Sequence, residues 1–171
     1  ATPVKKKGDG VVAVTASVAS ESTVAKDGFV CGRAKVWGNV FVGANGIITD
    51  DAEVSGDKDG MGVGMNSFGF QAVCGTAKVW GNVGLYGDTI IEGSAQVAGG
   101  SPKVAGKVFL NDESRISGSA QVMGTVTLKE KTQVSGAARV LDYRKAPLRQ
   151  TILAGHSKIS GNALLTHGVW V

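Results

Sequence analysis

Two cysteines are the first side chains in this sequence to suggest chemistry, because both open copies of one motif. Cys31 begins CGRAKVWGNV, and Cys74 begins CGTAKVWGNV 43 residues further on. The sequence has no Cys-x-x-Cys pair, and two cysteines make no disulfide framework. Two interpretations stay open: ordinary surface thiols, or thiols that form intermolecular disulfides with a neighbouring subunit or partner.

The two histidines, His156 and His167, are the only imidazoles of the chain. A zinc site built on histidine alone needs three of them, so we predict no metal site from this pair. One histidine could still serve as a general base. The sequence has no P-loop and no Gly-x-Ser-x-Gly motif. We predict no catalytic residue and no cofactor.

Acidic and aromatic residues supply two weaker candidate sites. One is a possible Ca²⁺ site, formed by four acidic residues: Asp50, Asp51, Asp57 and Asp59. The segment DKDG lacks the rest of an EF-hand loop, which favours a solvated corner over a calcium site. The other is a possible sugar-binding or protein-binding group of aromatic residues: Trp37, Trp80 and Tyr86.

The composition limits what kind of protein this is. The 171 residues include 26 Gly and only 3 Pro, and 43% of them are hydrophobic, which indicates a folded domain with many tight turns. The net charge of +4 is too small to indicate nucleic-acid binding. Neither a signal peptide nor a stretch of about 18 apolar residues is visible, so we expect no membrane partner. We expect residues 1–6 to form a flexible basic tail.

The elements that must position these side chains follow from a period of six. Aliphatic residues recur every sixth position over 12–54, 73–97, 104–140 and 153–171, usually with a small residue two positions earlier. Both side chains of such a pair point to one side of a strand, and the intervening Gly with a short polar residue turns the chain. One six-residue strand and turn cannot bury its apolar side alone, whereas stacked coils can.

We therefore predict an all-β, triangular β-solenoid of about eight 18-residue coils over residues 7–171. The 43-residue distance then equals two coils plus seven inserted residues, and loops are expected at 55–57, 64–67 and 141–147. The predicted coils are 7–24, 25–42, 43–63, 68–85, 86–104, 105–122, 123–140 and 148–165, with a partial coil at 166–171.

This register predicts one apolar outer face along the whole solenoid. Its outward residues are Val11, Phe29, Ile47, Ala72, Ile90, Phe109, Thr127, Ile152 and Trp170. A second face is polar: Ser17, Lys35, Glu53, Lys78, Gln96, Arg115, Gln133 and Lys158. An apolar face this long is too large for a monomer, so we predict an oligomer interface. Cys31 and Cys74 should lie at its edge, about 9.6 Å apart and too far for a disulfide with each other.

Repeats such as TDDAEV, EGSAQV, SGSAQV and SGNALL resemble the hexapeptide-repeat β-helix superfamily, whose solenoids are usually left-handed. Here Gly follows the aliphatic residue by two positions, as in VWG and VSG, which looks like the AxVxGx arrays of phage- or prophage-encoded proteins. The superfamily implies a homotrimer. The phage-type arrays imply a structural role in a virion, as a decoration, cement, spike or fibre module bound to another structural protein.

Two alternative functions stay open beside this structural one. The superfamily also contains acyltransferases, which would give His156 or His167 a role as base. A carbohydrate-binding adhesin would instead use Trp37, Trp80 and Tyr86.

Overall fold

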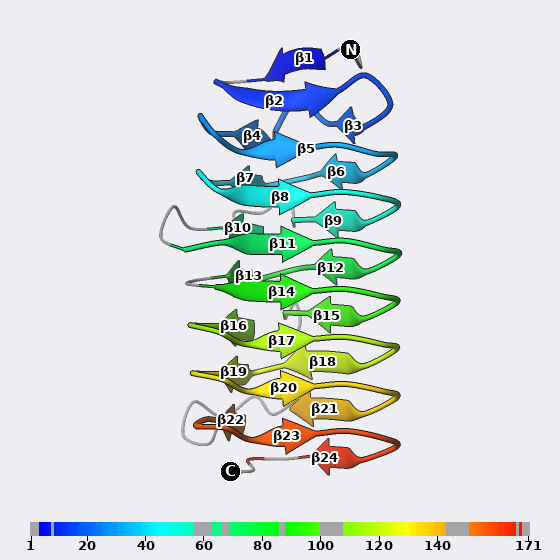
Figure 1. The fold of residues 1–171 in the computed structure, drawn as a ribbon, viewed down its shortest axis with the longest axis vertical. Coiled ribbons are helices and arrows are strands. Elements are labelled where there is room, and N and C mark those ends of the chain that lie inside the picture. Colours follow the sequence, from blue (N-terminus) through cyan, green and yellow to red (C-terminus); the bar gives the residue numbers. More distant parts are fainter. Residues whose placement is uncertain are drawn as a thin grey trace.

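The computed structural model is an all-β solenoid without helices among the residues that it describes, namely 4–7, 9–56, 63–65, 69–85, 88–99, 108–142, 151–166 and 168. Its strands form three sheets that enclose one core, here named sheets A, B and C (Figure 1). Each coil contributes one strand to sheet A, then one to sheet C, then one to sheet B. The predicted triangular β-solenoid of about eight coils is confirmed.

Sheet A is parallel except at its first strand. It consists of β1 (Val4–Lys7), β2 (Gly10–Ala13), β5 (Phe29–Val30), β8 (Gly46–Ile48), β11 (Gln71–Val73), β14 (Thr89–Ile91), β17 (Arg115–Ile116), β20 (Gln133–Val134) and β23 (Lys158–Ile159).

Sheets B and C are parallel throughout. Sheet B consists of β4 (Thr23–Val24), β7 (Val40–Val42), β10 (Val63–Met65), β13 (Val83–Leu85), β16 (Val108–Leu110), β19 (Val126–Leu128) and β22 (Thr151–Leu153). Sheet C consists of β3 (Ser17–Val18), β6 (Lys35–Trp37), β9 (Glu53–Ser55), β12 (Lys78–Trp80), β15 (Gln96–Ala98), β18 (Gln121–Gly124), β21 (Arg139–Asp142) and β24 (Leu164–Thr166).

The coils wind in the left-handed sense. In Figure 1 the strands of sheet A run from left to right at the front, and the chain returns behind them through sheets C and B while it descends. The core is filled by the aliphatic residues of the six-residue period, such as Val30, Ile48 and Val73, each fully buried. Sheet C adds a ladder of buried alanines that includes Ala34, Ala52 and Ala77.

The N-terminal end is covered by an antiparallel strand. β1 pairs with β2, with Val4 opposite Ala13 and Lys7 opposite Gly10. The prediction of a flexible tail is therefore wrong for residues 4–6, because the free edge of β2 offers backbone hydrogen bonds to this segment. Residues 1–3 lie outside the described part.

The connection from sheet C to sheet B varies from coil to coil. It is a short turn after β6, β12 and β18, whereas after β9, β15 and β21 it contains the segments 57–62, 100–107 and 143–150, which lie outside the described residues. Short and long connections thus alternate, which makes the structural repeat two coils rather than one. This explains why CGRAKVWGNV and CGTAKVWGNV begin 43 residues apart in the sequence.

The predicted loop positions need correction. Ser55 lies in β9, Gly64 and Met65 lie in β10, and Leu141 lies in β21. The seven inserted residues between Val54 and Val79 are confirmed, since β9 pairs directly with β12.

The coil register predicted after residue 98 is wrong. It gave Val104 a core position on the third face, whereas the structure passes from β15 of sheet C to β16 of sheet B with 100–107 as an insertion. Leu110 consequently pairs with Leu85 on sheet B, one face away from its predicted place. Every predicted coil from 105–122 onward is displaced by one face.

Candidate interaction surface

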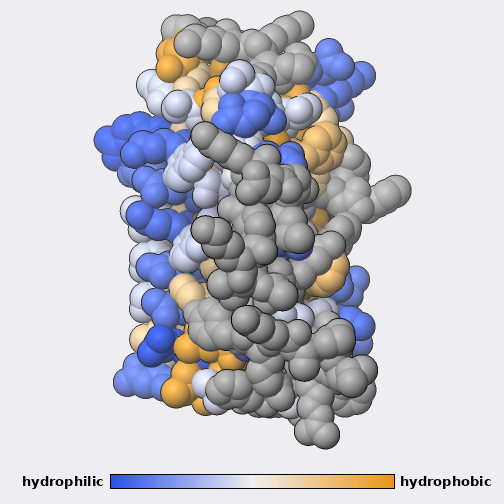
Figure 2. Space-filling view, turned by 180° about the vertical axis from the view of Figure 1, so that it is seen from behind, coloured by the Kyte–Doolittle hydropathy of each residue, from blue (hydrophilic) through white to orange (hydrophobic). Residues whose placement is uncertain are grey.

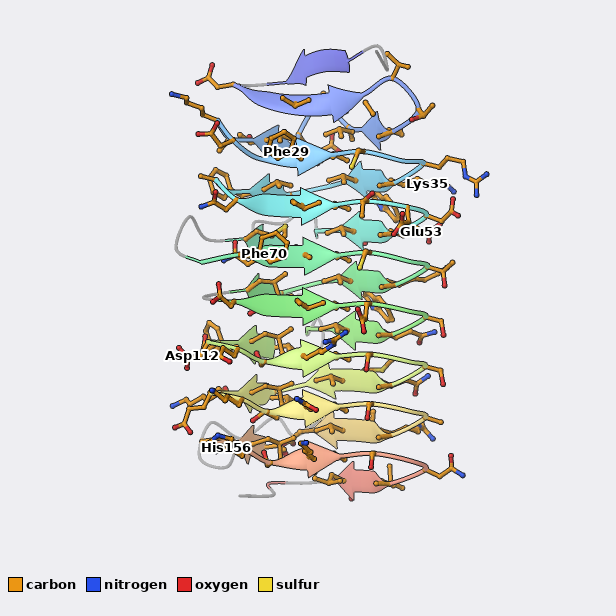
Figure 3. The ribbon with its side chains drawn as sticks, in the orientation of Figure 1. Phe29, Lys35, Glu53, Phe70, Asp112 and His156 are labelled. Atoms are coloured by element: carbon orange, nitrogen blue, oxygen red, sulfur yellow. The ribbon has the colours of Figure 1, made fainter. Side chains whose placement is uncertain are left out.

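Five outward side chains form an apolar stripe on sheet A. The pairing registers align them in consecutive coils, in the order Val11, Phe29, Ile47, Ala72 and Ile90. Phe29 is 42% exposed, Val11, Ile47 and Ile90 are partly exposed, and Ala72 is buried at 8%. Figure 3 labels Phe29 on the front face. We call these five residues the sheet A stripe.

The stripe ends at the fifth coil. The next strands of sheet A place Arg115, Gln133 and Lys158 in the same outward column, and all three are exposed. The predicted apolar face is therefore divided: Phe109, Thr127 and Ile152 lie on sheet B, and Trp170 lies outside the described residues. The displaced register after residue 98 is the reason.

Both cysteines lie at one edge of the stripe, as predicted. Cys31 and Cys74 follow the paired core residues of β5 and β11, and Thr49 follows that of β8 between them. The Cys31 Sγ lies 3.2 Å from Thr49 Oγ1. Both thiols are free and partly exposed, which agrees with the predicted separation of two coils.

The local environment of Cys74 disfavours its thiolate. Its pKa is raised chiefly by burial and further by the nearby charges of Glu92 and Asp50, although Arg115 acts in the opposite direction. A smaller fraction of Cys74 is therefore present as the reactive thiolate than for an ordinary cysteine at the same pH.

A row of ion pairs runs from coil to coil beyond the cysteines, on the side of sheet C. Arg33 binds Asp51 through two hydrogen bonds of 2.7 Å. Glu53 lies 3.3 Å from the Lys35 Nζ and 3.0 Å from the Lys78 Nζ, and Lys78 and Lys35 together lower the pKa of Glu53. Figure 3 shows Lys35 and Glu53 at this corner. These exposed pairs align neighbouring coils and leave little charge unpaired.

Sheet C carries the polar face. The outward column that matches the predicted polar face consists of Ser17, Lys35, Glu53, Lys78, Gln96, Gln121, Arg139 and Leu164. The predicted polar face is right for the first five, whereas Arg115, Gln133 and Lys158 lie on sheet A. Figure 2, which views the molecule from behind, shows hydrophilic side chains along this side.

The other predicted candidate residues do not come together. Asp51 is held by Arg33, and Asp50 accepts a hydrogen bond of 2.9 Å from the Gly75 backbone N–H; Asp57 and Asp59 lie outside the described residues. No group of three or more His, Cys, Asp or Glu side chains in the described part could hold a metal ion. His156 lies exposed in the turn before β23, and His167 is outside the described part.

The aromatic candidates are separated along one corner. Trp37 and Trp80 both oppose Ser55 in the sheet C register, two coils apart. Trp37 is 43% exposed and Trp80 is partly buried, whereas Tyr86 lies outside the described residues. The sequence reasoning did not single out Phe70, which is 42% exposed at the B side of sheet A; it lies outside the six-residue period, so the period gives no signal for it.

Comparison with known proteins gives no relative. No family model, no curated protein and no solved structure matches the chain significantly. Within its described part the chain has no helix that is both long and apolar enough to span a membrane. The β-solenoid fold and the sheet A stripe are therefore the features from which a function can be argued.

Proposed function

We propose that this protein is a non-enzymatic structural module: a rigid β-solenoid that associates with copies of itself through the sheet A stripe. It would serve as a decoration, cement, spike or fibre module of a larger assembly. The resemblance of its repeats to phage-encoded arrays favours a virion as that assembly, with another structural protein as a further partner.

The sheet A stripe is the observation that carries this proposal. Five uncharged side chains follow one another in one outward column of sheet A, and Phe29 exposes 42% of its surface there. Removing such side chains from water stabilises an interface by roughly 25 cal/mol per Å² of apolar area. The ladder of backbone hydrogen bonds from coil to coil supports rigidity, for example from Cys31 N to Ile48 O and from Cys74 N to Ile91 O.

The homotrimer, which the superfamily resemblance implies, stays a prediction. The apolar face that would form its interface covers only the first five coils, and not the whole solenoid. The number of copies that share the stripe is therefore a quantity for experiment.

Sedimentation velocity over a concentration series tests the proposal with a matched pair of variants. Ile47→Glu puts a charge at the centre of the stripe, and Gln133→Glu puts the same charge in the same outward column beyond its end. We expect the wild-type chain and Gln133→Glu to associate as concentration rises, and Ile47→Glu to remain monomeric. A wild-type chain that stays monomeric at every concentration, or equal loss in both variants, would overturn the proposal.

A further inference from the structure

We propose that two copies of the chain pair antiparallel through the sheet A stripe, about a twofold axis along β8, and that Cys31 of each copy forms a disulfide with Cys74 of the other. This inference rests on the proposed function and specifies its partner and geometry. It follows from the order of residues in the stripe and from the position of the two thiols relative to β8.

The stripe is complementary to its own reverse. A twofold axis along β8 places β5 opposite β11 of the second copy and β2 opposite β14, because these strands lie one and two positions from β8. Phe29 then faces Ala72, the largest side chain of the stripe against the smallest. Ile47 faces itself, and alternation of large and small residues across facing positions is what close packing needs.

The same axis brings the thiols together. Cys31 and Cys74 follow β5 and β11, one strand spacing on either side of β8 and at the same edge of the sheet. Rotation about the strand direction keeps that edge in place, so each Cys31 faces a Cys74. A parallel pair would instead place Phe29 against Phe29 and turn the cysteine edge toward the opposite edge of the second copy, where Asp27 lies.

A disulfide is compatible with facing sheets and excluded within one chain. Two coils separate Cys31 from Cys74 by about 9.6 Å, beyond the roughly 7 Å limit between Cα atoms. Immunoglobulin domains show that a disulfide can bridge two packed sheets. Both thiols are free and partly exposed, as such a bond requires.

The size of the stripe indicates why a covalent bond is needed. Five coils are about 24 Å tall, and a strand with its flanking residues is about 16 Å wide, a footprint of about 400 Å². Stable complexes bury about 800 Å² on each partner. At the sheet B edge of the stripe, Asp9 of one copy would face Asp88 of the other, because these residues precede β2 and β14, and their like charges would repel. Without the disulfides we therefore expect a weak dimer.

The bond forms by two thiol–disulfide exchanges with glutathione disulfide as the oxidant. The Cys31 thiolate attacks glutathione disulfide, which forms a mixed disulfide and releases one glutathione thiolate. The Cys74 thiolate of the second copy attacks the Cys31 sulfur and releases the second glutathione thiolate. The two cysteine protons go to the two glutathiones, and each protein disulfide reduces one glutathione disulfide.

Mixing two single variants tests the crossed linkage. Cys31→Ser and Cys74→Ser each keep one thiol, and each thiol would face a serine in a pair of identical copies. After incubation in a glutathione redox buffer, we expect the mixture to contain more than about tenfold more linked dimer than either variant alone, because pairing raises the effective thiol concentration. Trypsin separates the two sites into peptides 27–33 and 59–78, so mass spectrometry reads which thiols are joined.

Three outcomes overturn the inference: linked dimer in either variant alone at the level of the mixture, peptides joined 27–33 to 27–33 or 59–78 to 59–78, and no linked dimer at all. Sedimentation of the double variant Cys31→Ser/Cys74→Ser separates this failure from that of the proposed function. If this chain still associates, and Ile47→Glu abolishes its association, the stripe is an interface and only the antiparallel register is wrong.

Discussion

At the scale of single residues, Asp50 and Asp51, two of the candidate calcium ligands, make structural contacts with neighbouring coils instead. Asp51 and Glu53 hold neighbouring coils in register through Arg33, Lys35 and Lys78. The spacing of Cys31 and Cys74 was predictable because both lie where the six-residue period is intact. The 18-residue coil places Arg33 beside Asp51, but their ion pair was not predicted because it depends on rotamers that a period does not encode.

Cys74 should be a slow thiol in the folded protein. Because burial, Glu92 and Asp50 raise its pKa, less thiolate is present than in the unfolded chain at alkaline pH. We expect alkylation of Cys74 by iodoacetamide at pH 8.5 to accelerate on unfolding in urea, as read from peptide 59–78 by mass spectrometry. Glu92→Gln should accelerate the reaction of the folded chain, because it removes one of the charges that disfavour the thiolate.

The raised pKa of Cys74 also makes the free energy of unfolding depend on pH. A thiol whose pKa is raised on folding favours the folded state below its unfolded pKa, and this contribution is lost as the pH rises through the folded pKa. Equal alkylation rates for Cys74 in the folded and unfolded chain would contradict the assigned environment.

At the scale of elements, the short turns between sheets C and B depend on glycine. Gly38 has a φ of +72°, and a Cβ at this position would lie 1.9 Å from the Gly56 carbonyl oxygen. Gly64, in β10, has an unstrained φ, and a Cβ there would meet nothing within 4 Å. The two residues therefore form a matched pair for one substitution.

Gly38→Ala should destabilise the fold by about 2–4 kcal/mol, from backbone strain and from the displacement of the neighbouring coil. Gly64→Ala should change the free energy of unfolding by no more than about 0.5 kcal/mol. Denaturant unfolding followed by circular dichroism measures both. A similar midpoint for the two variants would mean that the turn relaxes without cost.

The register shows how far a period alone predicts this fold. Strand, turn and coil follow from the alternation of Ala and Val within each six-residue unit. The error after residue 98 arose because SPKV, which ends at Val104, looks like the end of one more unit although it belongs to the insertion 100–107. The two-coil repeat would have located it: SGSAQVMGTVTL begins at Ser117, 43 residues after Cys74, and β18 and β19 occupy the places of β12 and β13.

At the scale of the whole molecule, the solenoid carries a short apolar stripe on a stack of hydrogen-bonded coils. The hydrogen-bonded coils and continuous core leave few ways for the solenoid to bend, so any binding surface on it is held in a fixed shape. Sheet A is divided between five apolar coils and three polar ones, so the proposed association would use only the N-terminal part of that face. The sequence alone suggested a longer interface, because the register error carried Phe109 and Ile152 onto it.

Salt should strengthen association through the stripe. At its sheet B edge, Asp9 of one copy would face Asp88 of the other across the interface, and ions screen the repulsion between such exposed charges. We expect the dissociation constant from sedimentation to fall as sodium chloride rises from low to physiological concentration. A dissociation constant that rises with salt would instead indicate an interface held by ion pairs.

The mass of the unmodified chain in solution tests the central claim most directly. Multi-angle light scattering should be recorded after oxidation with glutathione disulfide and again after reduction. The account predicts a particle of twice the 17.4 kDa chain mass in the oxidised sample, and a concentration-dependent shift toward the monomer after reduction. A 17.4 kDa monomer in both samples at every concentration would contradict the claim that the stripe is an interface between copies.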